Sequence, residues 1–167
     1  MIEPLHFYAV SIVWALVEIA ISKKNEIRLL SNGAKEYGKE IYSPLAALYI
    51  ATLVFAPVEN MVKEGSIWLF MAIIFLISKF FKMWVIHTLR GAWVVKIYHW
   101  PGQEVRSGGP YRYFKHPNYV LMMIEIPAYC LAGEAWISAI VSTPLYFYLL
   151  WRKIKIENSL LYGGPAG

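Results

Sequence analysis

The sequence predicts an all-α integral membrane protein with about five transmembrane helices, the last two of them forming a helical hairpin. Of its 167 residues, 58% are hydrophobic and only 16% are charged, whereas soluble domains carry roughly a quarter charged residues. Aromatic residues, among them 7 tryptophans and 12 tyrosines, make up 16% of the chain, and such rings collect at membrane interfaces. The length suits one domain, so we take residues 1–167 as a single unit.

Five apolar segments account for the predicted helices, and they run approximately over residues 5–21, 44–62, 67–89, 119–132 and 135–151. A spanning helix needs about 20 apolar residues, with a range of about 17–25, so the first three segments are long enough alone. The fourth is short and joins the fifth through Gly133-Glu134, which predicts a tight hairpin. No lysine or arginine precedes the first segment and no cleavage site follows it, so we expect a retained helix rather than a signal peptide.

Positive charge gives the expected orientation. Thirteen of the 16 lysines and arginines lie in the connections after the first and third segments and in the tail. Lys63 alone lies in the opposite connections, and Lys79 and Lys82 lie inside the third segment. Because positively charged loops stay cytoplasmic, we expect a bacterial cytoplasmic membrane protein with its N-terminus outside and its C-terminus inside. The net charge of +5 then reflects the membrane topology rather than binding to nucleic acid. The sequence also lacks the cysteine and histidine spacing of a zinc site.

The two long cytoplasmic connections differ in character. In residues 22–43, charges mix with apolar residues, so we expect a short amphipathic helix at the headgroups, broken near Asn32-Gly33, that acts as a solvated connector without a catalytic part. The second connection, about residues 90–117, starts with the β-like stretch GAWVVKIYHW and continues with the turn-forming stretch PGQEVRSGGP. A loop of this length is usually functional or disordered, and its many aromatic residues argue against disorder. We expect an ordered cytoplasmic loop that forms a site.

The stretch HPNY at residues 116–119 follows this loop and predicts a helix start at Pro117, since proline is favoured at the first helical position. Free N–H groups at a helix start can bind a carboxylate or phosphate, and the glycines at 108–109 would let a ligand approach closely. His116 and Tyr111 add ring faces and hydrogen-bonding groups. Two interpretations stay open from these residues alone: a site for a zwitterion with an aromatic base, or an interfacial aromatic belt with a capping histidine.

Ionisable residues inside apolar segments cost about 2.5–3.5 kcal/mol each at mid-bilayer, so they usually face a cavity or a partner. Glu125 shares a helix face with Asn118, and we expect it to line the site. For Lys79 and Lys82 we favour side chains that extend toward the cytoplasm over a part in catalysis. Arg152 emerges where the last helix meets the cytosol, and its planar guanidinium can hold a carboxylate in two places.

The stretch GQEVRSGGPYRYFKHPNY, followed by a hairpin and then by Arg152 and Glu157, resembles the isoprenylcysteine carboxyl methyltransferases. Their loop reads approximately H-x-L-V-x-x-G-P-Y-x-x-x-R-H-P-x-Y, and their tail carries an arginine, a Glu-Glu pair and a leucine. The early stretch SKKNEIRLLSNGAKEYG resembles the bacterial branch of the family. Some members of that branch are linked to O-methylation of alkylpyrones, lipids made by type III polyketide synthases.

The resemblance implies an enzyme that uses S-adenosylmethionine to methylate a lipophilic acceptor from the bilayer, either an isoprenylcysteine-type carboxylate or an alkylpyrone-like lipid. The cofactor-binding residues that it implies are Gln103, Val105, Gly109, Tyr111, His116, Tyr119 and Glu157. It also implies that Arg152 orients the acceptor, and it makes Glu125, which matches an acidic residue of the bacterial branch, a second catalytic candidate. The chain departs from the family pattern at Gln103, Arg106 and Ile156, and again in the tail after residue 161.

Other functions remain open at this stage. The family pattern occurs more loosely in phospholipid N-methyltransferases and in membrane sterol reductases. An amine acceptor must lose a proton, so an N-methyltransferase would need a general base, and Glu125 is the available candidate. A non-enzymatic membrane protein such as a transporter subunit is a further alternative, although the chain shows no inverted repeat.

Overall fold

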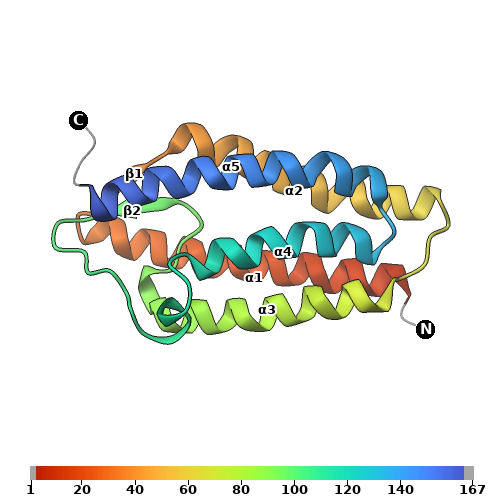
Figure 1. The fold of residues 1–167 in the computed structure, drawn as a ribbon, viewed down its shortest axis with the longest axis horizontal. Helices are drawn as coiled ribbons and strands as arrows, with labels where there is room; N and C mark the ends of the chain where they lie inside the picture. Colours follow the sequence, from red (N-terminus) through yellow and green to blue (C-terminus); the bar gives the residue numbers. More distant parts are fainter. Residues whose placement is uncertain (1–2, 164–167) are drawn as a thin grey trace.

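The computed structural model describes residues 3–163, so the last four residues of the divergent tail lie outside it. Its elements, in chain order, are α1 (Pro4–Ser31), β1 (Lys35–Tyr37), α2 (Lys39–Val62), α3 (Leu69–Leu89), η1 (Arg90–Ala92), β2 (Ile97–His99), η2 (Gly109–Arg112), α4 (Pro117–Ala132) and α5 (Trp136–Tyr162). The five helices run along the long axis of the molecule, and both strands and the long loop lie at one end (Figure 1). We call this the strand end. The opposite end, which carries the α2–α3 and α4–α5 connections, is the hairpin end.

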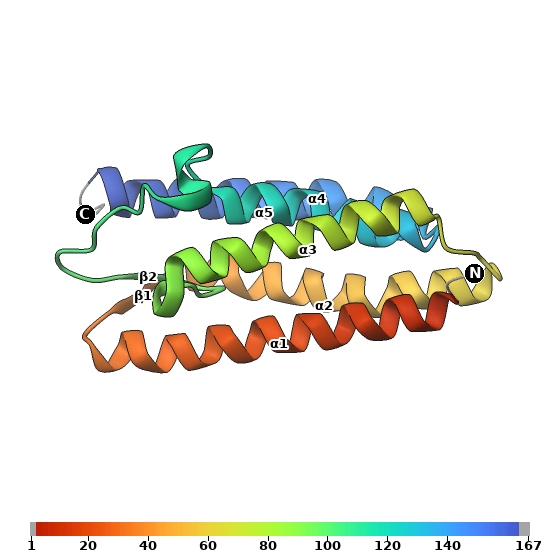
Figure 2. The ribbon, with the colours of Figure 1, turned by 90° about the horizontal axis from the view of Figure 1, so that it is seen from below.

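The predicted fold class is confirmed. Three helical stretches, Pro4–Ser31, Lys39–Val62 and Leu69–Ala92, are long and apolar enough to cross a membrane. Helix α4 has 16 residues and spans about 24 Å at 1.5 Å per residue, which is less than the roughly 30 Å of a bilayer core. It forms the predicted hairpin with α5 and packs between α3 and α5, while α2 packs along α5 (Figure 2).

The first connection differs from the prediction, because α1 continues to Ser31 instead of giving way to a separate amphipathic helix. Buried side chains, including Asn25, Glu26 and Leu29, recur at helical spacing through this extension, so packing against the rest of the protein keeps it helical. The predicted break at Asn32-Gly33 is confirmed: Asn32 caps the helix, and Gly33 has φ +82°, a conformation that glycine adopts without steric cost.

A two-stranded antiparallel sheet joins the two long connections. Its register pairs Lys35 with His99 and Tyr37 with Ile97, which confirms the β-like character predicted for the start of the second connection. The pairing holds the loop that follows η1 against the C-terminal end of α1. Residues far apart in sequence are therefore fixed together at the strand end.

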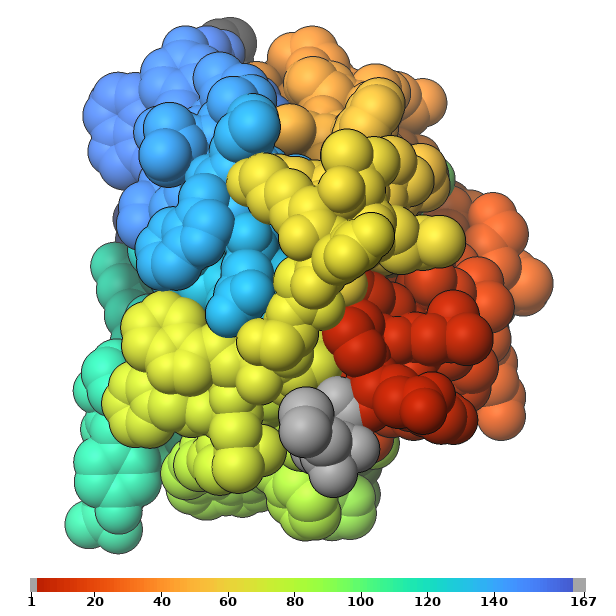
Figure 3. Space-filling model, turned by 90° about the vertical axis from the view of Figure 1, so that its right-hand side faces the viewer, coloured from red at the N-terminus to blue at the C-terminus, as the bar shows by residue number. Residues whose placement is uncertain are grey.

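The hairpin end is closed by hydrogen bonds between connections. The Asn60 side-chain amide donates to the Gly133 carbonyl over 2.6 Å, and the Trp68 backbone N–H donates to the Ala132 carbonyl over 2.7 Å. A Cβ on Gly133 would overlap the Tyr8 hydroxyl, so only glycine fits there. Figure 3 looks onto this end and shows the start of α1, the end of α2 and the start of α5 packed together without a large opening.

Candidate functional site

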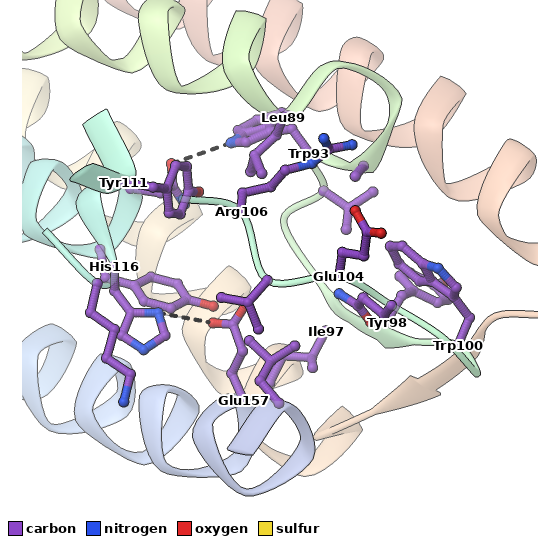
Figure 4. Close-up of a pocket in the computed structure, with 18 of the residues that line it drawn as sticks. Leu89, Trp93, Ile97, Tyr98, Trp100, Glu104, Arg106, Tyr111, His116 and Glu157 are labelled. Atoms are coloured by element: carbon purple, nitrogen blue, oxygen red, sulfur yellow. Dashed lines mark hydrogen bonds and ion pairs between the residues drawn. The ribbon is translucent and has the colours of Figure 1, made fainter. Parts of the chain in front are cut away.

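A cavity of about 310 Å³ lies at the strand end between the long loop, the start of α4 and the end of α5. Aromatic and polar side chains dominate its wall. Among its lining residues are Trp93, Tyr98, Trp100, Gln103, Glu104, Val105, Arg106, Tyr111, His116, Tyr119 and Glu157. Figure 4 shows these side chains converging from the loop on one side and from α4 and α5 on the other. We call this space the polar cavity.

The end of α1 and the strand β1 fix one side of the polar cavity. The Lys96 ammonium lies 2.8 Å from a Glu26 carboxylate oxygen and 3.4 Å from a Glu36 oxygen, and the Tyr98 hydroxyl donates to Glu26 over 2.8 Å. The hydrogen bond to Glu26 raises the pKa of Lys96, while burial, followed by the bond to Glu26, raises the pKa of Tyr98. The first connection, which we expected to be a connector alone, therefore helps to build the site wall.

The floor of the polar cavity centres on Trp93, which is only 2% exposed. Asn25 of α1 donates to the Trp93 carbonyl over 2.7 Å, and the indole N–H of Trp93 donates to the Asn118 side-chain oxygen over 3.3 Å. The next part of the loop is tied to α5, because the Lys153 ammonium donates to the Val95 carbonyl. Three helices and the loop thus hold one tryptophan in a fixed position.

His116 and Glu157 form the polar side of the cavity opposite the loop. The prediction that α4 begins at Pro117 is confirmed, and this start places His116 at the cavity mouth. Its Nδ1 lies 3.6 Å from the Glu157 Oε2, and its Nε2 lies 2.9 Å from the Asn158 Oδ1 (Figure 4 draws the first pair). An amide oxygen only accepts, so Nε2 carries the hydrogen in this arrangement, and Nδ1 is left to face the carboxylate.

Two buried oxygen atoms of the polar cavity lack a hydrogen-bond partner within residues 3–163. They are the Oε2 of Glu157 and the Oε1 of Gln103. Buried polar atoms are normally paired, and an unpaired one carries a free-energy cost of about 1–3 kcal/mol. Burial also raises the pKa of Tyr111, so its hydroxyl stays protonated. The cavity therefore fits a ligand that brings hydrogen-bond donors to two acceptor sites and a flat ring to the aromatic wall.

Most of the cofactor residues implied by the sequence meet in this cavity. Six of the seven line it: Gln103, Val105, Tyr111, His116, Tyr119 and Glu157. Gly109 does not. It has φ +59°, and a Cβ there would lie 2.7 Å from the Thr88 hydroxyl oxygen. We expected this glycine to let a ligand approach, whereas the structure shows that it lets the loop turn tightly against the end of α3.

Arg152, which the resemblance implies orients the acceptor, does not line the polar cavity. Its side chain is exposed and donates to the Tyr148 hydroxyl one turn earlier, over 3.1 Å. Successive helical residues differ in direction by about 100°, and here it is the neighbouring Lys153 that points inward and is 2% exposed. Its ammonium lies 5.2 Å from the centre of the Tyr119 ring. Lys153 therefore supports the cavity wall through Val95 and Tyr119 without lining it, and the sequence did not predict this because two adjacent cations do not show which of them faces inward.

Glu125 also lies away from the polar cavity, in a buried cluster of four charges. The Lys82 ammonium lies 2.9 Å from Glu18 and 2.8 Å from Glu125, and the Lys79 ammonium lies 2.8 Å and 3.1 Å from the same two carboxylates. The expectation that the lysines extend toward the cytoplasm is wrong, since both are almost fully buried. Pairing with carboxylates of α1 and α4 balances their charge inside the bundle. We call these four residues the charge quartet.

A second cavity of about 480 Å³, which no local sequence pattern predicts, lies between α1 and α2. Its wall is mainly apolar, but five charged residues also line it: Glu18 and Lys82 of the charge quartet, and Lys23, Glu26 and Lys96 nearer the strand end. Among its lining residues are Ala15, Glu18, Ile19, Leu45, Ala46, Tyr49, Ile50, Lys82, Met122 and Tyr146. Trp93, Lys96 and Asn118 line both cavities, so the two spaces adjoin. We call this one the apolar cavity.

The helical bundle has the architecture of an integral membrane protein, with an aromatic and polar cavity at one end as its candidate ligand site. Residues 70–163 match the family model described as the isoprenylcysteine carboxyl methyltransferase family, and the chain belongs to this family of membrane methyltransferases. Half of the polar cavity comes from residues that carry the family motif.

Two relatives resemble the chain over most of its length. "Uncharacterized protein YpbQ" of Bacillus subtilis strain 168 is 30% identical over 156 residues, which cover 92% of this chain and 93% of the relative. An "Uncharacterized protein" of Haemophilus influenzae strain Rd is 33% identical over 149 residues, or 86% of each chain. No solved structure gives a significant match.

Proposed function

We propose that the protein is an S-adenosylmethionine-dependent O-methyltransferase that acts on a lipophilic acceptor delivered from the bilayer. The observation that carries the proposal is the pair of unpaired buried oxygens, on Glu157 and Gln103, in an aromatic cavity built from the family motif. S-adenosylmethionine supplies a methyl group on a positively charged sulfur. Its amino group and ribose hydroxyls are donors of the kind that these two oxygens lack.

Each side of the polar cavity has a separate part in binding. Glu157, beside His116, would accept hydrogen bonds from the amino group of the cofactor, since a carboxylate pairs strongly with an ammonium. Gln103 would accept from a hydroxyl or an amine. Tyr98 and Trp100 offer ring faces against which an adenine ring can stack. Together these residues fix the position of the cofactor, and positioning is the largest part of what a direct group transfer requires.

The wall shared by the two cavities is the proposed place of transfer. Trp93 and Asn118 line both spaces, and the buried indole of Trp93 keeps water away from this wall. A carboxylate acceptor is already ionised at pH 7 and needs no general base. An amine acceptor would need one, and Glu125, the candidate for that role, is bound to two lysines. We therefore favour an oxygen acceptor over an amine.

The proposed orientation places the strand end in the cytoplasm. This end carries most of the lysines and arginines outside the helical interior, and positively charged connections stay on the cytoplasmic side. The cofactor would then reach the polar cavity from the cytosol, and the acceptor would reach the shared wall from the lipid.

A transfer assay tests the proposal. The purified protein is incubated with S-adenosylmethionine labelled in the methyl group and with lipid extract from its own membrane. We expect labelled lipid esters or ethers. His116→Ala should lower the rate about tenfold by loosening the polar side of the cavity, while His6→Ala at the hairpin end should leave it unchanged. Absence of any labelled product, or equal rates in the two variants, would contradict the proposed function.

A further inference from the structure

Three lysines line the apolar cavity, Lys23, Lys82 and Lys96, and Lys82 is the one that belongs to the charge quartet. Among the charge quartet, Lys82 and Glu18 line this cavity, whereas Lys79 and Glu125 do not. Both oxygens of Glu18 are already engaged, one by each lysine. An ammonium group has three N–H donors, and two of those of Lys82 face the carboxylates of Glu18 and Glu125. The third remains for a ligand, so this wall offers a donor rather than an acceptor.

Two tyrosines add to this donor character. Tyr49 of α2 and Tyr146 of α5 line the same cavity, and their ring centres lie 6.4 Å apart. Each hydroxyl can donate one hydrogen bond. Apolar side chains such as Ala15, Ile19 and Ile50 line much of the rest, and further polar and charged residues line it toward the strand end: Ser22, Lys23, Glu26, Lys96 and Asn118. The cavity thus combines a wall that suits a hydrocarbon chain with a small group of donors that suits oxygen atoms.

The donors lie close to the polar cavity. Trp93, which lines both cavities, packs against Val85 and Ile86 of α3. These residues follow Lys82 by about one helical turn, a rise of about 5 Å. A ligand group held by Lys82 would therefore lie within about one turn of the wall behind which the cofactor is proposed to bind.

We propose that the apolar cavity is the acceptor site, and that Lys82 with Tyr49 and Tyr146 selects lipids whose reactive group is an anionic oxygen, either a carboxylate or an enolate. The inference rests on the proposed methyl transfer and adds the place where the acceptor binds and the residues that recognise it. At this position a cationic amine head would meet the Lys82 ammonium and be repelled, because both oxygens of the neighbouring Glu18 are already paired with lysines. The two carboxylates of the quartet balance the two lysines, so the cavity can present a cation in apolar surroundings.

This assignment also explains how the product would leave. In the transfer, the anionic oxygen forms a bond to the methyl carbon, and the sulfur–methyl bond breaks with its electron pair kept on sulfur. No proton has to move, and the methylated oxygen is neutral. The product then loses its charged interaction with Lys82 and returns to the bilayer more readily than the acceptor entered.

Photolabelling of the whole protein in lipid nanodiscs, without S-adenosylmethionine, tests the assignment. The probes are a long-chain fatty acid with a photoreactive group in its chain, a 4-hydroxy-2-pyrone with the same chain, and the methyl ester and primary amine that match the fatty acid. Mass spectrometry then locates the label. We expect at least one anionic probe to label residues 15–26 of α1 and 42–50 of α2, and the ester and amine to do so about tenfold less. Which anionic probe labels more strongly distinguishes a carboxylate from an enol acceptor.

Matched variants separate recognition from structure. Lys82→Met and Lys79→Met each remove one ammonium from the quartet, but only Lys82 lines the cavity. We expect labelling by the anionic probes to fall about tenfold in Lys82→Met and less than twofold in Lys79→Met. If both lysine variants misfold, the double variant Tyr49→Phe and Tyr146→Phe, which keeps the quartet intact, should still lower labelling about fivefold. Equal losses in the two lysine variants, equal labelling by the amine, or wild-type labelling of the tyrosine variant would overturn the assignment.

Binding of S-adenosylhomocysteine, measured by titration calorimetry on the same samples, distinguishes the two proposals. If the cofactor analogue binds but the anionic probes do not label the apolar cavity, only the assignment of the acceptor site is overturned. Labelling that persists when the cofactor does not bind overturns the proposed methyl transfer instead.

Discussion

The two ends of the bundle use the same kinds of side chain in different ways. At the hairpin end, the Glu59 carboxylate accepts from the Ile137 and Ser138 backbone N–H groups over 2.9 and 2.8 Å, and it also binds Lys63 at 2.6 Å. At the strand end, the buried Oε2 of Glu157 has no hydrogen-bond partner within the described residues. The Glu59 oxygens are hydrogen-bonded within the protein and cap α5, whereas the Glu157 Oε2 forms no hydrogen bond among residues 3–163 and lies 3.6 Å from the His116 ring nitrogen.

The difference suggests a criterion for this fold: a carboxylate with a structural role has its hydrogen bonds within the protein, whereas one that binds a ligand has an oxygen without a hydrogen bond. Polar atoms at the hairpin end pair with neighbouring connections, as Asn60 does with Gly133 and Glu134 with Ser66. At the strand end, hydrogen bonds hold the backbone of the loop, while two side-chain oxygens remain unpaired in a cavity. We infer that the hairpin end provides stability and that the strand end provides binding.

Glu157→Gln should weaken binding of S-adenosylhomocysteine about 10- to 100-fold, because a hydrogen bond to a charged group contributes about 1.5–3 kcal/mol. Its thermal midpoint in detergent should stay within about 2 °C of the wild type, since the lost contact with His116 is long. Calorimetric titration and thermal unfolding measure the two quantities. A variant that loses stability but keeps its affinity would assign Glu157 to structure.

Glu59→Gln should lower the stability of the protein and leave its affinity for the cofactor unchanged. The new amide group would face backbone N–H donors at the start of α5, so we expect a loss of about 1–3 kcal/mol and a midpoint lower by about 2–8 °C. The folded fraction should bind the cofactor with wild-type affinity. A clear change in affinity without a change in midpoint would show that the two ends are not separate in function.

Lys153→Met should weaken cofactor binding about fivefold, because it frees the Val95 carbonyl from α5 and removes a cation packed against the Tyr119 ring. The neighbouring Arg152→Met serves as its control, since the Arg152 side chain is exposed and bonds only within its own helix among the described residues. Reversed effects, with the larger loss in Arg152→Met, would mean that the family arginine acts as the sequence first implied.

Arg152→Met itself should change the affinity for S-adenosylhomocysteine by less than twofold and the thermal midpoint by about 1 °C or less. An exposed contact of this kind contributes only tenths of a kcal/mol. The same titration and unfolding scans detect it. A tenfold loss of methyl transfer with unchanged cofactor binding would instead place Arg152 at the acceptor.

Much of the fold follows from local signals in the sequence. Hydrophobic length predicts the helices, Asn32-Gly33 predicts the end of α1, and Pro117 predicts the start of α4. The motif residues of the polar cavity were also found, because they lie close together along the chain. Features that depend on distant partners were missed. Glu18 and Glu125 lie 61 and 46 residues from Lys79 in the sequence, so no local pattern pairs them.

Hydrogen–deuterium exchange with and without S-adenosylhomocysteine tests the central division between the two ends most directly. We expect slower exchange of backbone amides in residues 93–119 and 153–162 when the cofactor analogue is present. We expect no change in residues 59–66 or 133–138 at the hairpin end. Unchanged exchange at the strand end under saturating ligand, or protection confined to the hairpin end, would contradict it.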